Sequence, residues 1–227
     1  IAALACAWIG AIFTPIFSGY GAEAVATRLR DAEAKILVTA DGYYRRGKVV
    51  PLKPTADQAA DLAPTVEHIL VARRLGLDVA MSAPRDLAWD AIVPAQAADL
   101  PIAVMDSMEP FMILHTSGTT GRPKGTVHYH AGFPVKASQD LAQLFDLRER
   151  EVLFWFSDLG WMMGPWAIIG GLSLGATVVL YEGAPDFPGP DRVWSLVENH
   201  RITHLGISPT LVRSLMAHGS VPVESHD

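Results

Sequence analysis

The chain has 227 residues, of which 50% are hydrophobic and 19% are charged, and its formal net charge is −6. This length and composition suit an α/β protein with a sizeable core, built as one large domain or two small lobes. The negative charge argues against a nucleic-acid partner. The single cysteine, Cys6, excludes an internal disulfide and fits a reducing cytoplasmic setting, with the thiol buried as a small apolar group.

The first twenty residues carry no charged side chain, and about 20 apolar residues can span a bilayer. Gly10 and Pro15 interrupt the run, however, and no basic segment precedes it. We therefore favour a buried core segment over a membrane helix or a signal peptide. The pattern predicts a buried helix over Ala2–Ile9 and a core strand near Ala11–Phe17.

The following segments alternate between helix and strand. Val25 and Leu29 share one face of the first expected helix, because they are four residues apart. Alternation of this kind is typical of a parallel sheet. The expected elements are a helix over residues 22–32, a strand over 35–39, a helix over 56–62, a strand over 67–71, and irregular chain over 73–103 with a short helix near 86–92.

A basic turn follows the first of these strands. Asp41 and Gly42 favour a turn, and three cations, Arg45, Arg46 and Lys48, lie within four residues. On composition alone, this segment is a solvated loop.

A Gly- and Thr-rich stretch, residues 116–125, follows an apolar run that is short enough for one buried strand. Its three glycines and one proline argue against a regular helix or strand there. Hydroxyl groups, approachable backbone N–H groups and the charges of Arg122 and Lys124 suit phosphate oxygens. The order is not that of a Walker A loop, because Lys124 precedes Gly125, and the dinucleotide and hydrolase-elbow patterns also fail. Composition leaves an ordinary surface loop open as the alternative.

The second half again alternates helix and strand. His128 and His130 are two residues apart, but no further ligand stands at zinc spacing, so we do not interpret them as a metal site. Several tryptophan and methionine residues lie near residue 161. Their side chains could fill the core or line a cavity, and composition leaves both interpretations open. The expected elements are a possible strand over 126–130, helix 131–145, strand 151–156, helix 166–174, strand 176–181, helix 192–200, strand 203–208 and helix 210–218.

The order Thr-Ser-Gly-Thr-Thr-Gly-Arg-Pro-Lys-Gly over residues 116–125 resembles the signature loop of the adenylate-forming enzymes, which include acyl-CoA synthetases and peptide-synthetase adenylation domains. The resemblance implies that this loop holds the β- and γ-phosphates of ATP while a carboxylate attacks the α-phosphate. It assigns the catalytic residues to Lys124 and Thr119. The implied phosphate-binding residues are Thr116, Ser117, Gly118, Thr119, Thr120, Gly121 and Lys124.

Within that family, residues 5–11, 31–35 and 39–42 resemble short-chain acyl-CoA synthetases of the acetyl-CoA synthetase kind. In those enzymes the basic turn contacts the phosphates of coenzyme A. Arg45 and Lys48 match its basic positions best, and Arg46 is a third candidate. A glycine-rich turn beside the same ligand corresponds to Gly19, although Ser18 departs from the pattern.

The segment Asp158-Leu159-Gly160-Trp161-Met162-Met163 resembles the part of acetyl-CoA synthetases that forms the acyl pocket and the adjoining pantetheine channel. The implied pocket residues are Trp161, Met162 and Met163. Acetate enzymes tend to have smaller side chains at the two methionine positions, and this string is closer to acetoacetyl-CoA synthetases. A short carboxylate other than acetate is therefore plausible.

The resemblance implies an α/β fold with parallel or mixed sheets flanked by helices, as part of the large N-terminal domain of an acyl-CoA synthetase. We expect one lobe over residues 1–105 with the coenzyme A-side turn, and a second over 106–227 with the phosphate loop and the acyl-pocket segment. The C-terminal domain would be absent, so the chain would be an internal fragment with little turnover of its own.

The implied activity joins a short carboxylate to coenzyme A through an acyl-adenylate, with ATP and Mg²⁺. No membrane partner is expected, and no metal-ligating residue is assigned. Three alternatives stay open. One is an adenylation domain that loads a carrier protein, the second is a non-catalytic nucleotide-binding module, and the third is a membrane protein.

Overall fold

The computed structural model describes residues 1–116 and 123–226. Contacts between Cα atoms group the chain into two compact units, which are described separately below. The first unit comprises Ile1–Tyr43 and Val49–His130, and the second comprises Tyr44–Lys48 and Ala131–Asp227. The division into lobes near residue 105 stays a prediction.

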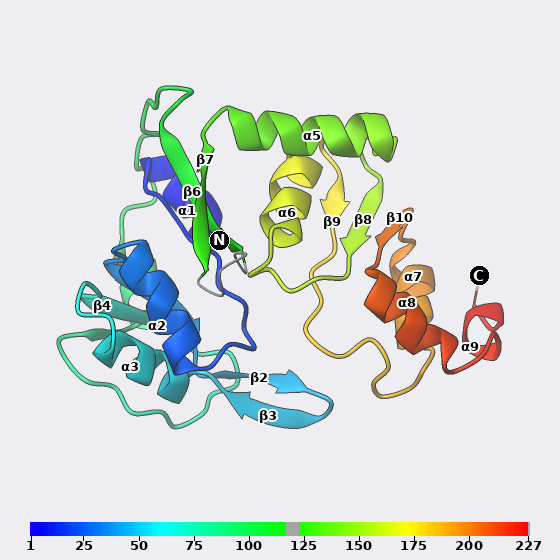
Figure 1. The fold of residues 1–227 in the computed structure, drawn as a ribbon, viewed down its shortest axis with the longest axis horizontal. Coiled ribbons are helices and arrows are strands. Elements are labelled where there is room, and N and C mark those ends of the chain that lie inside the picture. The colour runs from blue at the N-terminus through cyan, green and yellow to red at the C-terminus, as the bar shows by residue number, and fades with distance from the viewer. Residues whose placement is uncertain (117–122, 227) are drawn as a thin grey trace. The chain divides into compact units, whose positions relative to one another are not determined.

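A three-stranded parallel sheet of order β1-β4-β5 organises the first unit, as the alternation of helix and strand predicts (Figure 1). Val25 and Leu29 of α2 are buried together against Ala59 of α3, and Ala60 of α3 packs on Ile69 of β4. The elements are α1 (Ala2–Ile9), α2 (Ala22–Asp31), β1 (Ile36–Ala40), α3 (Lys53–Asp61), β4 (His68–Ala72), β5 (Asp86–Ala88), α4 (Trp89–Ile92), the 3₁₀-helix η1 (Val93–Ala95), β6 (Pro110–Thr116) and β7 (Lys124–Tyr129).

The N-terminal expectations are only partly confirmed. Helix α1 has the predicted extent, but none of its residues is buried, and Trp8 is 47% exposed. The predicted strand over residues 11–17 is wrong, because only Phe13 forms a bridge, to Met112 of β6. Pro15 lacks an N–H group and cannot continue the ladder, which explains why the pairing stops.

Strands β6 and β7 form an antiparallel hairpin in which Thr116 is opposite Lys124. Phe111, Met112 and Leu114 of β6 are buried, and the Phe111 ring packs edge-on against Phe13 at 5.1 Å between ring centroids. The expectation that all of residues 116–125 would be irregular is wrong at both ends, because the two strands extend to Thr116 and from Lys124.

The basic turn is a second hairpin, β2 (Gly42–Arg45) and β3 (Lys48–Pro51), and not a simple loop. Arg46 and Gly47 connect the strands with φ angles of 51° and 72°. Two consecutive positive φ angles are typical of the type I′ turn, whose twist matches that of two-residue β-hairpins. The predicted short helix near residues 86–92 begins only at Trp89, because residues 86–88 pair with β4 as strand β5.

The second unit has its own parallel sheet, of order β10-β8-β9, with α5 and α6 packed on each other (Figure 1). Val193 of α7 is buried against Leu211 and Leu215 of α8. The predicted strand over residues 176–181 is reduced to two paired residues. The elements are α5 (Gly132–Leu144), β8 (Val152–Trp155), α6 (Met163–Ser173), β9 (Thr177–Val178), α7 (Arg192–His200), β10 (His204–Gly206), α8 (Pro209–Met216) and α9 (Val221–Glu224).

No helix in residues 1–116 or 123–226 has both the length and the apolar character that a bilayer crossing requires.

Candidate functional site

The predicted phosphate loop is the connection of the hairpin formed by β6 and β7, which we call the phosphate hairpin. Ser117, Gly118, Thr119, Thr120 and Gly121 lie outside the described residues, as does Arg122. Thr116 and Lys124 are described, and the hairpin register places them opposite each other at the base of the loop. The Thr116 hydroxyl donates to the Lys124 carbonyl over 3.5 Å, and both residues are exposed. The two outermost predicted phosphate ligands are therefore held side by side.

The side chain of His115, near the end of β6, connects this strand to other parts of the first unit. Its side chain is only 1% exposed; Nε2 lies 2.9 Å from Asp31 Oδ2, and Nδ1 lies 3.2 Å from the Thr14 hydroxyl. Both ring nitrogens therefore have a partner within the first unit. Sequence reasoning missed this anchor, although an imidazole directly before the loop was a visible signal.

Gly125, the first glycine of β7, fits closely against the same anchor. A Cβ at this position would lie 2.9 Å from Ile113 Cγ2 and 3.1 Å from Asp31 Oδ2. A larger residue would therefore push the hairpin away from Asp31 or from its own partner strand.

The predicted coenzyme A cations, Arg45 and Lys48, are the last residue of β2 and the first residue of β3. In a two-residue hairpin these positions are opposite each other and on the same face, with Cβ atoms about 5 Å apart. Both side chains are exposed, and neither forms an ion pair with another described residue. We call Arg45 and Lys48 the basic pair. Two like charges in direct opposition repel each other, so an anion bound between them would relieve the repulsion.

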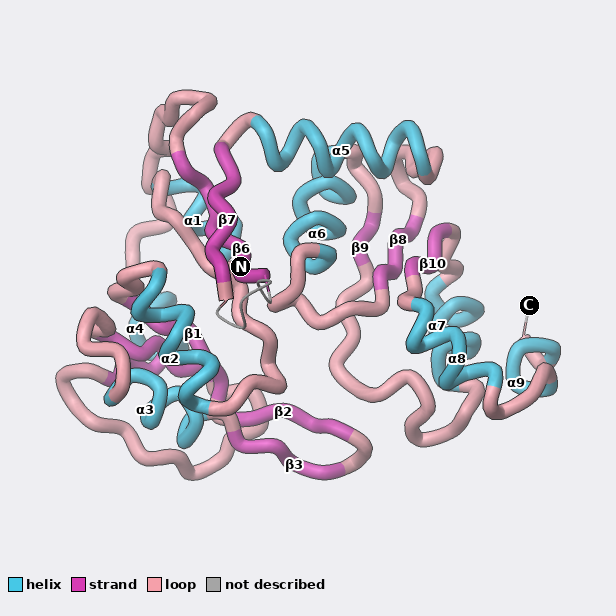
Figure 2. The backbone as a smooth tube through the Cα atoms, viewed as in Figure 1, coloured by secondary structure: helices cyan, strands magenta, loops and turns pink. Residues whose placement is uncertain are grey.

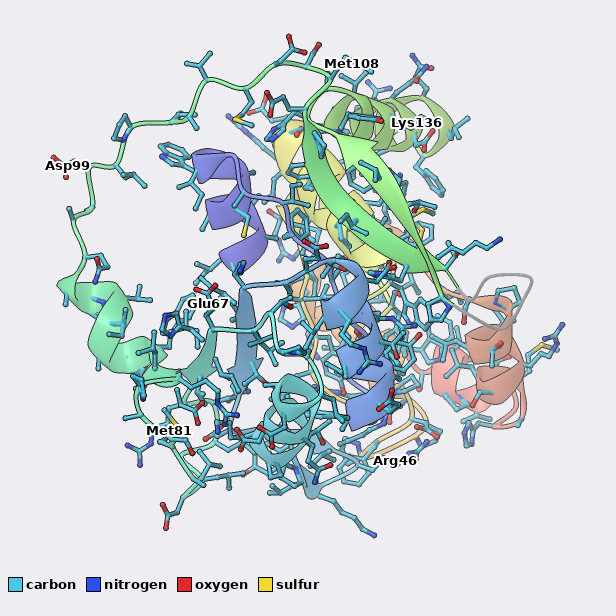
Figure 3. The ribbon with its side chains drawn as sticks, turned by 60° about the vertical axis from the view of Figure 1, so that its left-hand side comes forward. Arg46, Glu67, Met81, Asp99, Met108 and Lys136 are labelled. Atoms are coloured by element: carbon cyan, nitrogen blue, oxygen red, sulfur yellow. The ribbon has the colours of Figure 1, made fainter. Side chains whose placement is uncertain are left out.

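Arg46, the third cation of the turn, is already paired. Its Nη2 atom lies 2.7 Å from Asp186 Oδ1 and 2.8 Å from Oδ2, inside the second unit. The hydrogen bond from Arg46 lowers the pKa of the Asp186 carboxyl, so this side chain is ionised at neutral pH. Asp186 lies on the long loop between β9 and α7, and Arg46 is labelled at the turn of its hairpin (Figures 2 and 3).

Gly19, the third predicted coenzyme A contact, lies in an exposed turn of the first unit. A Cβ there would meet the Phe17 ring at 2.6 Å. A side chain at this position would therefore require the Phe17 ring to move.

The predicted acyl-pocket residues lie where a turn enters α6. The Asp158 carboxylate accepts from the Gly160 N–H over 2.8 Å and forms the turn. Trp161 and Met162 are then 41% and 51% exposed, and Met163 begins the helix. The prediction that this helix begins only at residue 166 is wrong, because α6 already begins at Met163 and includes Gly164.

Gly164 nevertheless has a packing role. A Cβ on it would lie 2.5 Å from Leu159 Cα, so its absence lets the turn fold back onto the helix. Trp166, which follows, is core filling: it is 7% exposed, and its ring packs edge-on against Trp155 at 4.9 Å.

Asp41 supports the base of the basic hairpin, and the sequence did not reveal this role. Its carboxylate accepts N–H groups from Gly42, Arg74, Leu75 and Leu77 over 2.8–3.1 Å. Burial opposes its ionisation, but these four donors outweigh burial and lower the Asp41 pKa to about 2. An ionised, fully bonded carboxylate therefore joins the start of β2 to the chain after β4.

Metal-binding chemistry is not supported by the part of the chain that the structure describes. Within residues 1–116 and 123–226, no three or more His, Cys, Asp or Glu side chains gather closely enough to hold an ion.

Comparison with known proteins places this geometry in context. A family model described as AMP-binding enzyme matches residues 1–227. The acetyl-coenzyme A synthetases of Rhodopirellula baltica and Methanothrix thermoacetophila are 46% and 44% identical to this chain, over 100% and 96% of its length. The chain covers only 34% and 33% of those two proteins.

Among solved structures, an acetoacetyl-CoA synthetase from Streptomyces lividans matches 100% of this chain and 34% of its own, with a TM-score of 0.89 and 30% identity. This likeness confirms the predicted fold class, an α/β arrangement of parallel and antiparallel sheets flanked by helices.

Proposed function

Because the chain belongs to the AMP-binding enzyme family, we propose that it is the part of an AMP-forming short-chain acyl-CoA synthetase that binds the phosphates of ATP and receives coenzyme A. The observation that carries the proposal is the family match over all of residues 1–227, which includes the complete signature loop.

The proposed reaction has two steps. A carboxylate oxygen attacks the α-phosphorus of ATP, a P–O bond forms, and pyrophosphate leaves with the electron pair of the broken P–O bond. The sulfur of coenzyme A then attacks the acyl carbon and forms a C–S bond. The C–O bond to AMP breaks, AMP leaves with its electron pair, and the thiol proton is released to solvent. The carboxylate needs no general base, because it is already ionised at pH 7.

The phosphate hairpin would hold the β- and γ-phosphates during the first step. The attack brings two anions together, so positive charge and N–H donors at the phosphates lower the barrier. Lys124 would supply the charge, and the hydroxyl groups of Thr116 and Thr119 would donate hydrogen bonds. Bound Mg²⁺ would add charge neutralisation at the phosphates.

The basic pair would bind coenzyme A for the second step. A phosphate monoester carries close to two negative charges at neutral pH, which matches the two opposed cations Arg45 and Lys48. Gly19 would let the ligand approach the backbone of its turn. Trp161, Met162 and Met163 would line the acyl pocket.

The test is carboxylate-dependent exchange between ATP and pyrophosphate, measured on the complete gene product with acids from acetate to benzoate and with acetoacetate included. Exchange with one acid, followed by thioester formation when coenzyme A is added, is the expected result. Exchange without thioester formation would instead favour a domain that loads a carrier protein. ATP binding without exchange would favour a non-catalytic nucleotide-binding module.

The named relatives do not agree on the acid. Acetyl-coenzyme A synthetases are the more similar in sequence, whereas the solved structure is an acetoacetyl-CoA synthetase. The Gly-Trp-Met-Met string over residues 160–163 is more similar to acetoacetyl-CoA synthetases than to acetate enzymes, but a difference of one methylene in a pocket is worth only about 1–3 kcal/mol. We therefore propose a short-chain acid and expect more than one to be accepted.

A further inference from the structure

The tip of the basic hairpin, residues 44–48, is held in place by the loop between β9 and α7, and both belong to the second unit. Besides the ion pair between Arg46 and Asp186, the Tyr44 N–H donates to Glu182 Oε1 over 2.9 Å. The Phe187 ring also packs closely on the turn, because a Cβ on Gly47 would lie 2.9 Å from Phe187 Cζ.

The Tyr44 bond follows from the hairpin register. In a two-residue hairpin, the residues that flank the turn, here Arg45 and Lys48, exchange hydrogen bonds with each other. The next residue outward, Tyr44, therefore directs its N–H away from β3. The Glu182 carboxylate accepts the hydrogen bond from this N–H group, which in a solvated loop would bond to water.

Arg46 is an unusual choice for its position. Its φ angle of 51° lies in the left-handed region, where glycine, asparagine or aspartate is easier to accommodate. A residue that served only to make the turn would be one of those. The Arg46 guanidinium instead contacts Asp186, whose side chain is only 14% exposed.

Resting on the proposed function, we propose that Arg46, Asp186 and Glu182 are positioning residues for coenzyme A. These three residues hold the tip of the basic hairpin, residues 44–48, so that Arg45 and Lys48 stay exposed and opposite each other. Each of the three acts through its contact at the tip: Arg46 with Asp186, and Glu182 with the Tyr44 N–H. A binding site whose charges are held in place before the ligand arrives loses less conformational entropy on binding.

The test exchanges the charges of the ion pair in the complete gene product. Arg46→Asp keeps a residue that tolerates positive φ, and Asp186→Arg supplies the opposite charge. We expect each single substitution to raise the KM for coenzyme A about tenfold, the scale of one lost charge-assisted hydrogen bond. The double substitution should recover most of that loss. ATP–pyrophosphate exchange without coenzyme A should keep its kcat and its KM for ATP in all three variants.

Asp99→Arg is the matched control, because it makes the same charge change at an exposed residue on the connection before β6 (Figure 3). It should leave every constant unchanged. An unchanged KM for coenzyme A in both single variants would overturn the proposal, as would a double variant without recovery. An equal loss of exchange activity would also overturn it, by showing a general effect on folding. Failure of the proposed function itself is distinct, because the unmodified protein would then show no carboxylate-dependent exchange.

Discussion

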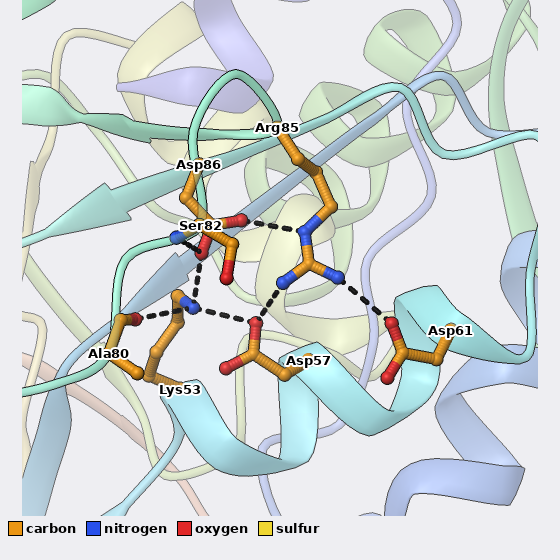
Figure 4. A network of polar contacts seen from close by, with 7 residues as sticks. All are labelled: Lys53, Asp57, Asp61, Ala80, Ser82, Arg85 and Asp86. Atoms are coloured by element: carbon orange, nitrogen blue, oxygen red, sulfur yellow. Dashed lines mark hydrogen bonds and ion pairs between the residues drawn. The ribbon is translucent and has the colours of Figure 1, made fainter.

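Lys53 and Asp86 form an ion pair in the interior of the first unit, with Nζ 2.6 Å from Oδ2 and side chains that are 1% and 0% exposed. The ammonium group also donates to Asp57 Oδ1 over 2.6 Å and to the Ala80 carbonyl over 2.9 Å, so all three of its hydrogens have acceptors (Figure 4). Arg85 bonds the other oxygen of Asp86 at 2.7 Å. Removal of one member would therefore leave a buried charge short of partners.

We predict that Lys53→Met lowers the free energy of unfolding by about 3–5 kcal/mol, the usual cost of breaking a buried ion pair. Lys35→Met is the control, since Lys35 and its partner Glu67 are 66% and 60% exposed and such pairs contribute about 0–1 kcal/mol. Thermal unfolding of both variants measures the difference. Similar midpoints for the two would contradict the prediction.

Acid should destabilise the first unit through Asp86 and Asp41. Burial opposes ionisation of Asp86, but hydrogen bonds from Arg85, Lys53 and the Ser82 N–H lower its pKa from 3.8 to about 2, and the pKa of Asp41 falls equally far. Because the pKa is lower in the folded state than in the unfolded state, each carboxylate stabilises the fold at pH values above its unfolded-state pKa. This stabilisation is lost as the pH falls from about 4 to 2.

Each of these shifts corresponds to about 2 kcal/mol. We expect Asp41→Asn to be less stable than the unmodified protein at pH 7 and to lose stability less steeply in acid. Thermal midpoints measured between pH 7 and pH 3 give the two curves. Parallel curves would show that Asp41 does not carry this dependence.

The alternation of helix and strand in the first unit was predictable from the sequence, because the spacing of a few apolar residues determines each element. Val25 and Leu29 share the buried face of α2, and the apolar run of β4 pairs with β1, as expected. The hairpin of residues 42–51 could not be predicted, since Arg46 occupies a turn position that sequence rules assign to glycine or asparagine. Its ion pair with Asp186, 140 residues away, is a tertiary contact that no local pattern encodes.

Close contact between α5 and α6 depends on Gly170. A Cβ at this position would lie 2.9 Å from the Ala137 backbone C and O atoms and 2.8 Å from Leu141 Cδ1. We therefore expect Gly170→Ala to destabilise the protein by about 1–3 kcal/mol through overpacking. Gly132→Ala in the first turn of α5 is the control, because nothing lies within 4 Å of its Cβ position. That change should be neutral or stabilising, as alanine favours helix by up to about 1 kcal/mol. Equal thermal midpoints for the two variants would rule out close packing as the reason for Gly170.

His115 should affect ATP more than coenzyme A. Its ring is the link from the end of β6 to Asp31 and Thr14, so His115→Phe releases the base of the phosphate hairpin while filling the same space. We expect the KM for ATP in pyrophosphate exchange to rise about tenfold, for roughly one misplaced phosphate contact. The KM for coenzyme A should stay within about twofold, below 0.5 kcal/mol. Asp31→Asn keeps an acceptor for the imidazole and should show a smaller change in the same direction. A uniform fall in both steps would indicate simple loss of folded protein.

The site was less predictable than the fold. The family resemblance predicts Thr116 and Lys124 as phosphate ligands, and the structure places the two residues opposite each other. It could not reveal the contact of His115 with Asp31, because these residues are 84 positions apart in the sequence. The acyl segment is a second example. Its pocket role stays a prediction, and the start of α6 was placed three residues too late, since glycine and proline at positions 164 and 165 are also tolerated in the first turn of a helix.

The choice of acid should depend on the methionines that begin α6. If Met162 and Met163 line the acyl pocket, shortening either to valine changes the room for the acid but not the contacts to ATP. We therefore expect Met162→Val and Met163→Val to change the ratio of kcat/KM between acetoacetate and acetate, by about 10- to 200-fold at most. Their KM for ATP should be unchanged. Met216→Val on α8, where the methionine is 71% exposed, is the matched control and should leave the ratio as it is. If all three variants keep the same ratio, the two methionines lie outside the pocket, and the preference for an acid must be set elsewhere in the complete protein.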